Sequence, residues 1–133
     1  MCFEFWDEKF SVGMKDIDDQ HKELFKMISY LRNAVKSGKE KEMLINIIEN
    51  FLYITLASFR LEEEYMSKYN LNNLESHISE HKSFVTRIED FKNSFTCSDT
   101  MSALHGLDYF ILWMTFHITE FDKEYSVYNS SAA

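Results

Sequence analysis

Residues 74–95, LESHISEHKSFVTRIEDFKNSF, decide the fold class. Within this stretch one set of residues recurs at alternating spacings of four and three. Its members are His77, His81, Phe84, Ile88, Phe91 and Phe95. Residues at these spacings lie on one face of an α-helix. The pattern predicts an amphipathic helix over about residues 74–94, whose inward face begins with two histidines and continues with apolar side chains.

Three further stretches repeat this periodicity. The first covers residues 18–36 and is ended by Gly38, and the second covers about residues 40–69. The last begins after an N-cap at Ser98 or Asp99 and reaches about residue 122. The inward rows are His21, Leu24, Phe25, Ile28, Leu31 and Val35 in the first; Leu44, Ile48, Phe51, Thr55, Ser58, Glu62 and Met66 in the second; and Leu104, Leu107, Phe110 or Ile111, Met114, His117 and Phe121 in the last, with Asp122 just beyond.

Glycine and proline are scarce in this chain. Its 133 residues include no Pro and three Gly, whereas β-sandwiches and doubly wound folds use many of both in their turns. Four helices of about 20 residues with short connections favour an up-down-up-down antiparallel bundle. We therefore expect an all-α four-helix bundle in a single domain, residues 1–133, with an extended aromatic N-terminal arm at 1–17, the bundle at 18–122 and a tail at 123–133.

The net charge argues against one class of partner, and the cysteine spacing argues against two kinds of structural site. With 14 Lys and Arg against 22 Asp and Glu, the formal net charge is −8, and such a chain would repel a nucleic acid. Cys2 and Cys97 have no metal-binding spacing, which argues against a disulfide scaffold or a zinc module. No stretch has the roughly 18 uninterrupted apolar residues of a membrane span, and the first residues lack a signal-peptide pattern. We expect a cytoplasmic protein with no nucleic-acid or membrane partner.

Groups that can ligate a metal interrupt the inward row of every predicted helix. They are His21, Glu62, His77, His81 and His117. Any one histidine on an apolar face is more often a hydrogen-bonded core residue than a ligand. Together, however, four of the five histidines and one glutamate align on four inward faces, where unpaired polar groups are costly. His77 and His81, at positions i and i+4, leave one helical face together. The alignment predicts a metal site in the core.

The position of the fifth histidine shows which histidines can share this site, and the types of ligand indicate which metal it holds. His105 lies about 18 Å along a helix and about 120° around it from His117, so we expect His105 at the surface. Imidazole and carboxylate ligands suit iron, zinc, copper or manganese. Four histidines with two carboxylates, Glu62 and Asp122, exceed what a closed tetrahedral zinc site needs. This surplus favours a two-metal centre with iron as its occupant.

Ordered motifs along the chain carry a family resemblance. They are Trp6…Val12-Gly13-Met14…Ile17-Asp18-xx-His21, Ser58-Phe59-xx-Glu62-Glu63-xx-Met66, His77-xxx-His81 and Trp113-xxx-His117-Ile118-xxx-Asp122. From residue 6 to 122, this order and spacing resemble those of the bacterial hemerythrins. The resemblance implies a four-helix bundle that holds two non-haem iron ions with an oxo or hydroxo bridge and binds O₂ at one of them.

The resemblance also implies a ligand set. The implied ligands are Glu62 and Asp122 as bridging carboxylates, His77, His81 and His117 on one iron, and His21 on the O₂-binding iron. The family carries one further histidine on the second helix for the O₂-binding iron. In this chain Ser58 stands at that position.

Ser58 leaves two hypotheses open. In the first, its hydroxyl bonds back to the carbonyl of Ile54, a water replaces the imidazole and the centre still assembles. In the second, the hydroxyl is too short and weak a donor, so the second iron is held weakly in a wetter, enlarged pocket with altered reactivity. Glu63 lies about 100° around the helix from Glu62, so we expect it on a solvated face with Glu64 and not at the metal.

Three functional hypotheses follow from these features. The first is an oxygen-binding protein without catalytic turnover, for oxygen storage, delivery, scavenging or sensing, with NO, peroxide or azide as related ligands, in a monomer or weak oligomer. The second is a di-iron redox enzyme acting on peroxide or nitric oxide, which an open position at Ser58 favours. The third is a sensor or interaction bundle with incomplete metal loading. Iron content separates the third hypothesis from the first two: about two irons per chain would support the first two, about one would indicate a lost second site, and none would contradict the interpretation as a whole.

Overall fold

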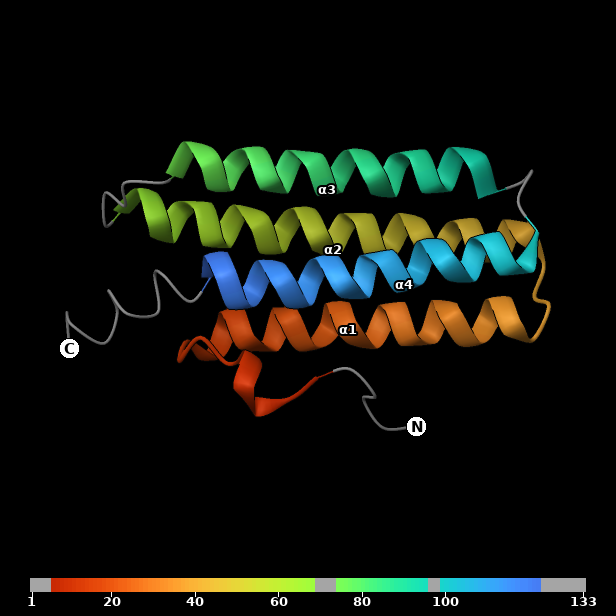
Figure 1. Cartoon of the computed structure of the whole chain (residues 1–133), viewed down its shortest axis with the longest axis horizontal. Coiled ribbons are helices and arrows are strands. Elements are labelled where there is room, and N and C mark those ends of the chain that lie inside the picture. Colours follow the sequence, from red (N-terminus) through yellow and green to blue (C-terminus); the bar gives the residue numbers. More distant parts are fainter. Residues whose placement is uncertain (1–5, 69–73, 96–98, 123–133) are drawn as a thin grey trace.

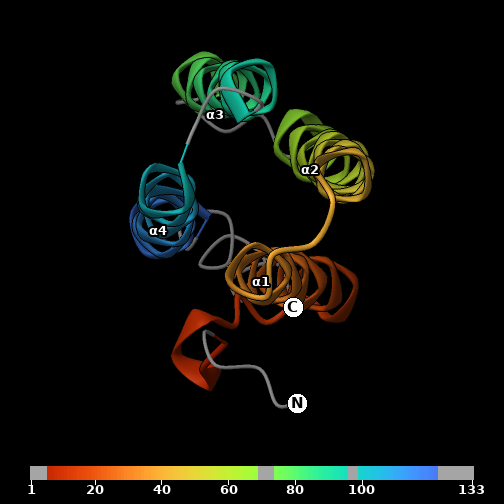
Figure 2. The same cartoon turned by 90° about the vertical axis from the view of Figure 1, so that its right-hand side faces the viewer.

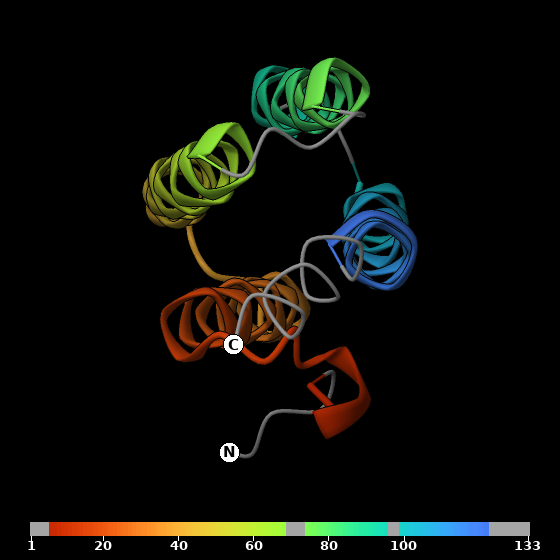
Figure 3. The same cartoon turned by 90° about the vertical axis from the view of Figure 1, so that its left-hand side faces the viewer.

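The computed structural model describes residues 6–68, 74–95 and 99–122, and those residues form no strand. Four long helices follow one another: α1 (Lys15–Lys36), α2 (Lys41–Lys68), α3 (Leu74–Ser94) and α4 (Thr100–His117). They lie side by side, with consecutive helices running in opposite directions (Figure 1). Figures 2 and 3, which look along the helices, place them around a square in the order α1, α2, α3, α4. The predicted all-α, up-down-up-down four-helix bundle is confirmed.

The start of α1 differs from the predicted boundary. The helix begins at Lys15, one turn before Asp18. Lys15 and Asp16 are exposed, and the first buried residue of the helix is Ile17, so no apolar periodicity marks this first turn. The acidic side chains of Asp16 and Asp18 lie in the first turn, where they favour the positive end of the helix dipole.

The end of the fourth helix also differs from the prediction. α4 ends at His117 and is followed by a π-helical turn, η3 (Ile118–Asp122), where the regular helical row was expected to continue to Phe121. At its other end the predicted N-cap is confirmed, because the Asp99 carboxylate accepts a hydrogen bond from the backbone N–H of Ser102 at 2.8 Å. Ser98, the alternative cap, lies outside the described residues, as does Tyr69, the predicted last residue of the second helix.

The N-terminal arm packs along α1. Its predicted extended course is interrupted by a short 3-10 turn, η1 (Glu8–Phe10). Phe10 and Val12 are buried, and the ring of Phe10 stacks on Phe25 of α1 with centroids 5.7 Å apart. The carboxylate of Asp18 accepts a hydrogen bond of 2.8 Å from the backbone N–H of Val12. The arm is therefore fixed to the first turn of α1 by a hydrogen bond and by aromatic packing.

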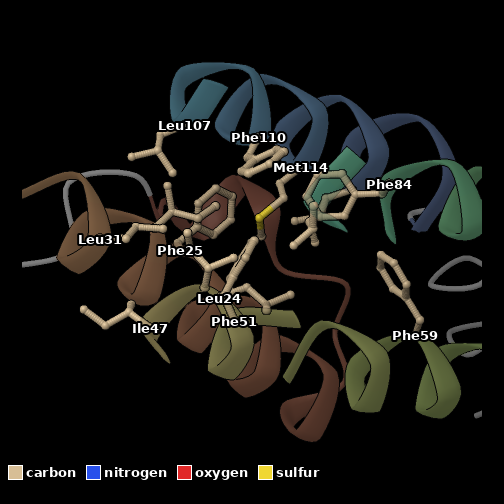
Figure 4. Packing of buried hydrophobic residues seen from close by; sticks show 14 of the residues in the cluster. Leu24, Phe25, Leu31, Ile47, Phe51, Phe59, Phe84, Leu107, Phe110 and Met114 are labelled. Atoms are coloured by element: carbon tan, nitrogen blue, oxygen red, sulfur yellow. The ribbon is translucent and has the colours of Figure 1, made fainter. Parts of the chain in front are cut away.

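The core is a column of aromatic and branched side chains between the helices (Figure 4). The ring of Phe110 on α4 lies 5.5 Å from Phe84 of α3 and 6.0 Å from Phe51 of α2. Toward the end of the bundle where α1 and α3 begin, the core becomes polar. The buried polar side chains there are His21, Ser58, Glu62, His77, His81 and His117. The fold thus brings donors from all four helices to one end of its core.

α2 is long and apolar enough to cross a membrane, judged by length and composition alone. The core helix of a soluble protein passes the same test. In this structure the inward row of α2 packs inside the bundle, and it includes the fully buried side chains of Thr55, Ser58 and Glu62. The burial of these polar groups is typical of a core helix that contributes to an internal site.

Gly106 is required where α4 approaches α3. A Cβ at this position would lie 2.7 Å from Cε1 and 2.8 Å from Cδ1 of Phe91. We expect Gly106→Ala to lower the free energy of unfolding by about 1–3 kcal/mol, because the Phe91 ring must move. Urea unfolding measures this change, with Ser79→Ala, at an exposed position of α3, as the control. Unchanged stability of Gly106→Ala would contradict the expected clash.

Candidate metal centre

Four buried side chains from three helices converge at the polar end of the core. Glu62 comes from α2, His77 and His81 come from the first half of α3, and His117 is the last residue of α4. One ligand atom of each lies within 4.8 Å of the others. His21 of α1 reaches this group through Glu62. The structure thus brings together five of the six predicted ligands.

The three imidazoles of the cluster meet through the same ring atom. Nε2 of His117 lies 3.1 Å from Nε2 of His77 and 3.1 Å from Nε2 of His81. A neutral imidazole nitrogen either carries one proton or offers one lone pair, so three that face one another cannot all hydrogen-bond among themselves. Two nitrogens bound at right angles to one metal ion at roughly 2.1 Å are roughly 3.0 Å apart. The donor set and its spacing therefore fit a metal ion.

Glu62 connects His21 to this cluster. Its side chain is fully buried, with Oε1 2.7 Å from Nε2 of His21 and Oε2 3.1 Å from Nε2 of His81. Burial acts to raise the pKa of this carboxyl, but the hydrogen bond from His21 and the adjacent imidazole of His81 outweigh it and hold the pKa well below its usual range. A charged carboxylate with one oxygen directed to each side is suited to bridging two metal ions.

Burial keeps His117 neutral. Loss of solvent lowers the pKa of its imidazole to about 3, and the attraction of the Glu62 charge opposes this only in part. A neutral ring at physiological pH keeps a lone pair available, and metal binding requires that form of histidine.

Acid is expected to destabilise the metal-free protein. An unfolded histidine titrates near pH 6.5, whereas folded His117 titrates at about 3, so the unfolded chain binds the extra proton between these values. The stabilising contribution of neutral His117 is complete above about pH 6.5 and declines toward pH 3 by about 1.4 kcal/mol per pH unit. Urea unfolding between about pH 7 and pH 5 measures the slope. His117→Gln should give a shallower slope, and equal slopes would contradict this assignment.

Aromatic side chains fix the planes of two of these imidazoles. The ring of Phe59 stacks on His81 with centroids 3.7 Å apart and an interplanar angle of 1°. Trp113 stacks on His117 at 4.4 Å and 11°, and it also stacks on Phe84 at 4.0 Å. Stacked rings resist tilting, so both imidazoles are held in fixed orientations before any metal binds.

A small cavity of about 10 Å³ lies beside His21 and His117. The rest of its lining is aliphatic or aromatic: Leu24, Phe59, Phe84, Trp113, Met114 and Ile118. Figure 4 shows Leu24, Phe84 and Met114 gathered in the interior of the bundle. A space of this size holds about one water molecule or a similarly small guest.

Ser58 is completely buried on the inward face of α2. Its hydroxyl has no hydrogen-bond partner in the described structure, so the bond to the carbonyl of Ile54, which the first of the two hypotheses requires, is not formed. Thr55, one turn earlier, does form such a bond, to the carbonyl of Phe51 at 2.7 Å. A buried hydroxyl without a partner is costly, so this oxygen remains available to a group from outside the chain.

Glu63 is the residue that the sequence interpretation placed wrongly. It was expected on a solvated face, but its Oε2 lies 2.7 Å from Nδ1 of His81, and its side chain is only 32% exposed. The position of Glu63 on the helix could have indicated this contact. A residue about 100° around α2 from Glu62 faces the neighbouring helix α3, and a metal-binding histidine generally donates its second ring N–H to an acceptor.

His105 and Asp122 are the two other positions that the sequence singled out. His105 is exposed on α4, as the helical geometry predicts. Asp122 is the last residue of η3, but its side chain lies outside the described part of the structure. Its role as a second bridging carboxylate therefore stays a prediction.

The bundle and its buried cluster of imidazoles and carboxylate define a four-helix protein with a candidate metal site in its core. The family model described as "Hemerythrin HHE cation binding domain" matches residues 12–126. This chain belongs to the hemerythrin family.

Curated relatives and a solved structure agree with this assignment. The chain is 30% identical over 121 residues to a bacteriohemerythrin of Pseudomonas aeruginosa (strain LESB58), covering 90% of this chain and 77% of that protein. It is 29% identical over 120 residues to a myohemerythrin of Theromyzon tessulatum, covering 90% and 88%. A crystal structure of a hemerythrin point mutant superimposes with a TM-score of 0.82 at 22% identity, covering 95% of this chain and 96% of the other. This last similarity concerns the fold alone.

Proposed function

We propose that this chain holds two non-haem iron ions in its core and binds O₂ or a related small ligand there, without catalytic turnover. The observation that carries the proposal is the arrangement around Glu62, with three converging imidazoles on one side and His21 on the other. Similarity to proteins named bacteriohemerythrin and myohemerythrin supports it.

The proposed centre has two unequal positions. In one, His77, His81 and His117 would hold an iron ion. In the other, His21 would hold the second, with Glu62 between the two and Asp122 as a second bridge. Iron bound there would supply a redox-active ion with an open coordination position for O₂. The chain itself holds the ring planes, keeps Glu62 charged and keeps His117 neutral.

We propose the cavity beside His21 and His117 as the ligand site. Apart from these two imidazoles its lining is aliphatic and aromatic, with Leu24, Met114 and Ile118 among the contributors. Such a lining excludes bulk water and offers little to stabilise a free ion, which favours a small neutral guest such as O₂. NO, peroxide and azide are the related ligands that we propose as probes of this site.

We further propose that the position beside His21 is the weaker of the two. The family resemblance implies a histidine at the position of Ser58. A serine side chain is shorter, and its neutral oxygen is a weak metal ligand. The Ser58 hydroxyl is buried and without a hydrogen-bond partner in the described structure, which supports an incomplete ligand set here. The same observation favours a second candidate function, a redox activity on peroxide or nitric oxide.

Anaerobic reduction followed by exposure to air tests the proposal. The iron-loaded wild-type chain and Ser58→His are reduced, exposed to air and returned to argon while absorbance and iron content are followed. A spectral change that reverses under argon supports O₂ binding, and irreversible oxidation with consumption of added peroxide supports the redox alternative. If both proteins gave the same reversible spectrum, the proposed effect of Ser58 would be wrong.

We also propose that residues 1–133 act as one domain in the cytoplasm, as a monomer or weak oligomer. The packing of the N-terminal arm on α1 supports a single unit. The chain carries two cysteines, Cys2 and Cys97, and this low cysteine content is typical of proteins from a reducing compartment.

A further inference from the structure

Glu63 contacts the cluster of imidazoles from outside. It faces α3, because it lies about 100° around α2 from Glu62. Its Oε2 is 2.7 Å from Nδ1 of His81. At the opposite edge of the same ring, Nε2 lies 3.1 Å from Nε2 of His117 and 3.1 Å from Oε2 of Glu62. The His81 ring is therefore held between the Glu63 carboxylate and the candidate metal position.

The contact between Glu63 and His81 determines where the ring carries its proton. An ionised carboxylate only accepts hydrogen bonds, so a contact of 2.7 Å calls for a proton on Nδ1. A neutral imidazole protonated at Nδ1 presents its lone pair at Nε2, toward the cluster. Phe59 fixes the plane of this ring by stacking on it, and Glu63 fixes the rotation of the ring within that plane.

We propose that Glu63 is a positioning residue for the metal centre, which holds the His81 proton on Nδ1 and directs Nε2 to the metal. This proposal rests on the proposed function, because it gives Glu63 a role toward a metal held by His77, His81 and His117. A carboxylate acceptor at the second nitrogen also makes the first nitrogen a stronger donor to the metal. Glu63 thereby increases the affinity of the site with three histidines.

The same contact lies in a surface cleft between α2 and α3. This cleft has a volume of about 530 Å³, and Arg60, Glu63, His81 and Lys82 are the polar and charged members of its lining, together with Thr86. The side chain of Glu63 is 32% exposed, whereas that of His81 is 2% exposed. Water in the cleft can therefore reach Nδ1 of His81 when Glu63 is removed. Substitution of Glu63 should weaken metal binding without leaving a buried group unpaired, so the fold should keep its stability.

Zinc titration of the full chain tests this role. We expect Glu63→Ala to weaken the tightest zinc site by roughly 10–100-fold. Glu63→Gln, whose amide oxygen still accepts a hydrogen bond, should recover part of that loss. Glu64→Ala alters the next, exposed glutamate and should bind zinc as the wild-type chain does. The melting temperature of the metal-free protein should be the same in all four proteins.

Nitrogen-15 NMR of the metal-free protein reports the tautomer of His81 directly. We expect a proton on Nδ1 in the wild-type chain and in Glu63→Gln, and a mixture of tautomers in Glu63→Ala. Equal zinc affinity of the wild-type chain and Glu63→Ala, or a wild-type proton confined to Nε2, would overturn the role of Glu63. If the wild-type chain bound no zinc, the metal centre itself would be contradicted, and the NMR measurement would still decide whether Glu63 sets the tautomer.

Discussion

Replacing Glu62 with alanine is expected to abolish tight metal binding on both sides of the centre. Glu62 is the one side chain whose two oxygens reach His21 at 2.7 Å and His81 at 3.1 Å among the described residues. Its removal takes a negative charge away from both positions. Residues that only orient a ligand are worth roughly 10–100-fold in affinity, so the loss of a shared direct ligand should exceed about 100-fold at each position. Anaerobic titration with Fe(II) or Co(II) measures both losses.

Two matched variants separate metal binding from folding in this experiment. Glu62→Gln keeps the shape of the side chain but removes its charge, so it should also lose tight binding. Glu64→Ala removes an exposed carboxylate from the same turn and should retain full metal content. Circular dichroism of each metal-free protein checks that the bundle is intact. Full metal content in both Glu62 variants would show that Glu62 does not bridge the site.

Ser58→His is expected to produce the largest gain of metal affinity. The substitution supplies an imidazole on the inward face of α2, one helical turn before Glu62 and at the position that the family resemblance assigns to a histidine. We expect the affinity of the second metal ion to rise by more than about 100-fold, since a direct ligand is worth more than an orienting partner. The first ion, held by His77, His81 and His117, should bind as before. Titration with Co(II), followed by visible absorbance, resolves the two steps.

Ser58→Ala is the control for this substitution. It removes the hydroxyl without adding a ligand, so the second metal ion should bind no more tightly than in the wild-type chain. The metal-free stability should be unchanged or slightly higher, because the hydroxyl is buried without a hydrogen-bond partner in the described structure. Two equally tight metal ions in the wild-type chain would contradict the proposed weakness at Ser58.

Periodicity was sufficient to predict the bundle. The helix over residues 74–94 was predicted with the bounds that α3 has, because a buried residue recurs on almost every turn. The first turn of α1 was missed because Lys15 and Asp16 are exposed and carry no apolar signal. The π-helical turn after His117 was missed because the spacing of a few residues at a helix end does not separate a π turn from an α turn.

The sequence predicts which side chains point into the candidate site. It does not predict the contacts that these side chains make on the side away from the metal position. His77 and His81 share a helical face by spacing alone, and the structure brings them within reach of His117. The contact between Glu63 and His81 depends on how α2 and α3 pack, and a single helical pattern does not contain that information. The state of Ser58 also depends on packing, because back-bonding within the helix and an unpartnered hydroxyl are both compatible with the same sequence.

The number of iron ions that the wild-type chain binds, and the affinity of each, test the central claim most directly. The measurement is an anaerobic Fe(II) titration, followed by desalting and an iron assay. We predict two steps of unequal affinity, with about one iron per chain retained after desalting and the second released, since a ligand-poor position releases its ion first. Retention of no iron would contradict the proposed centre, and retention of two equally tight irons would contradict the proposed difference between its two sides.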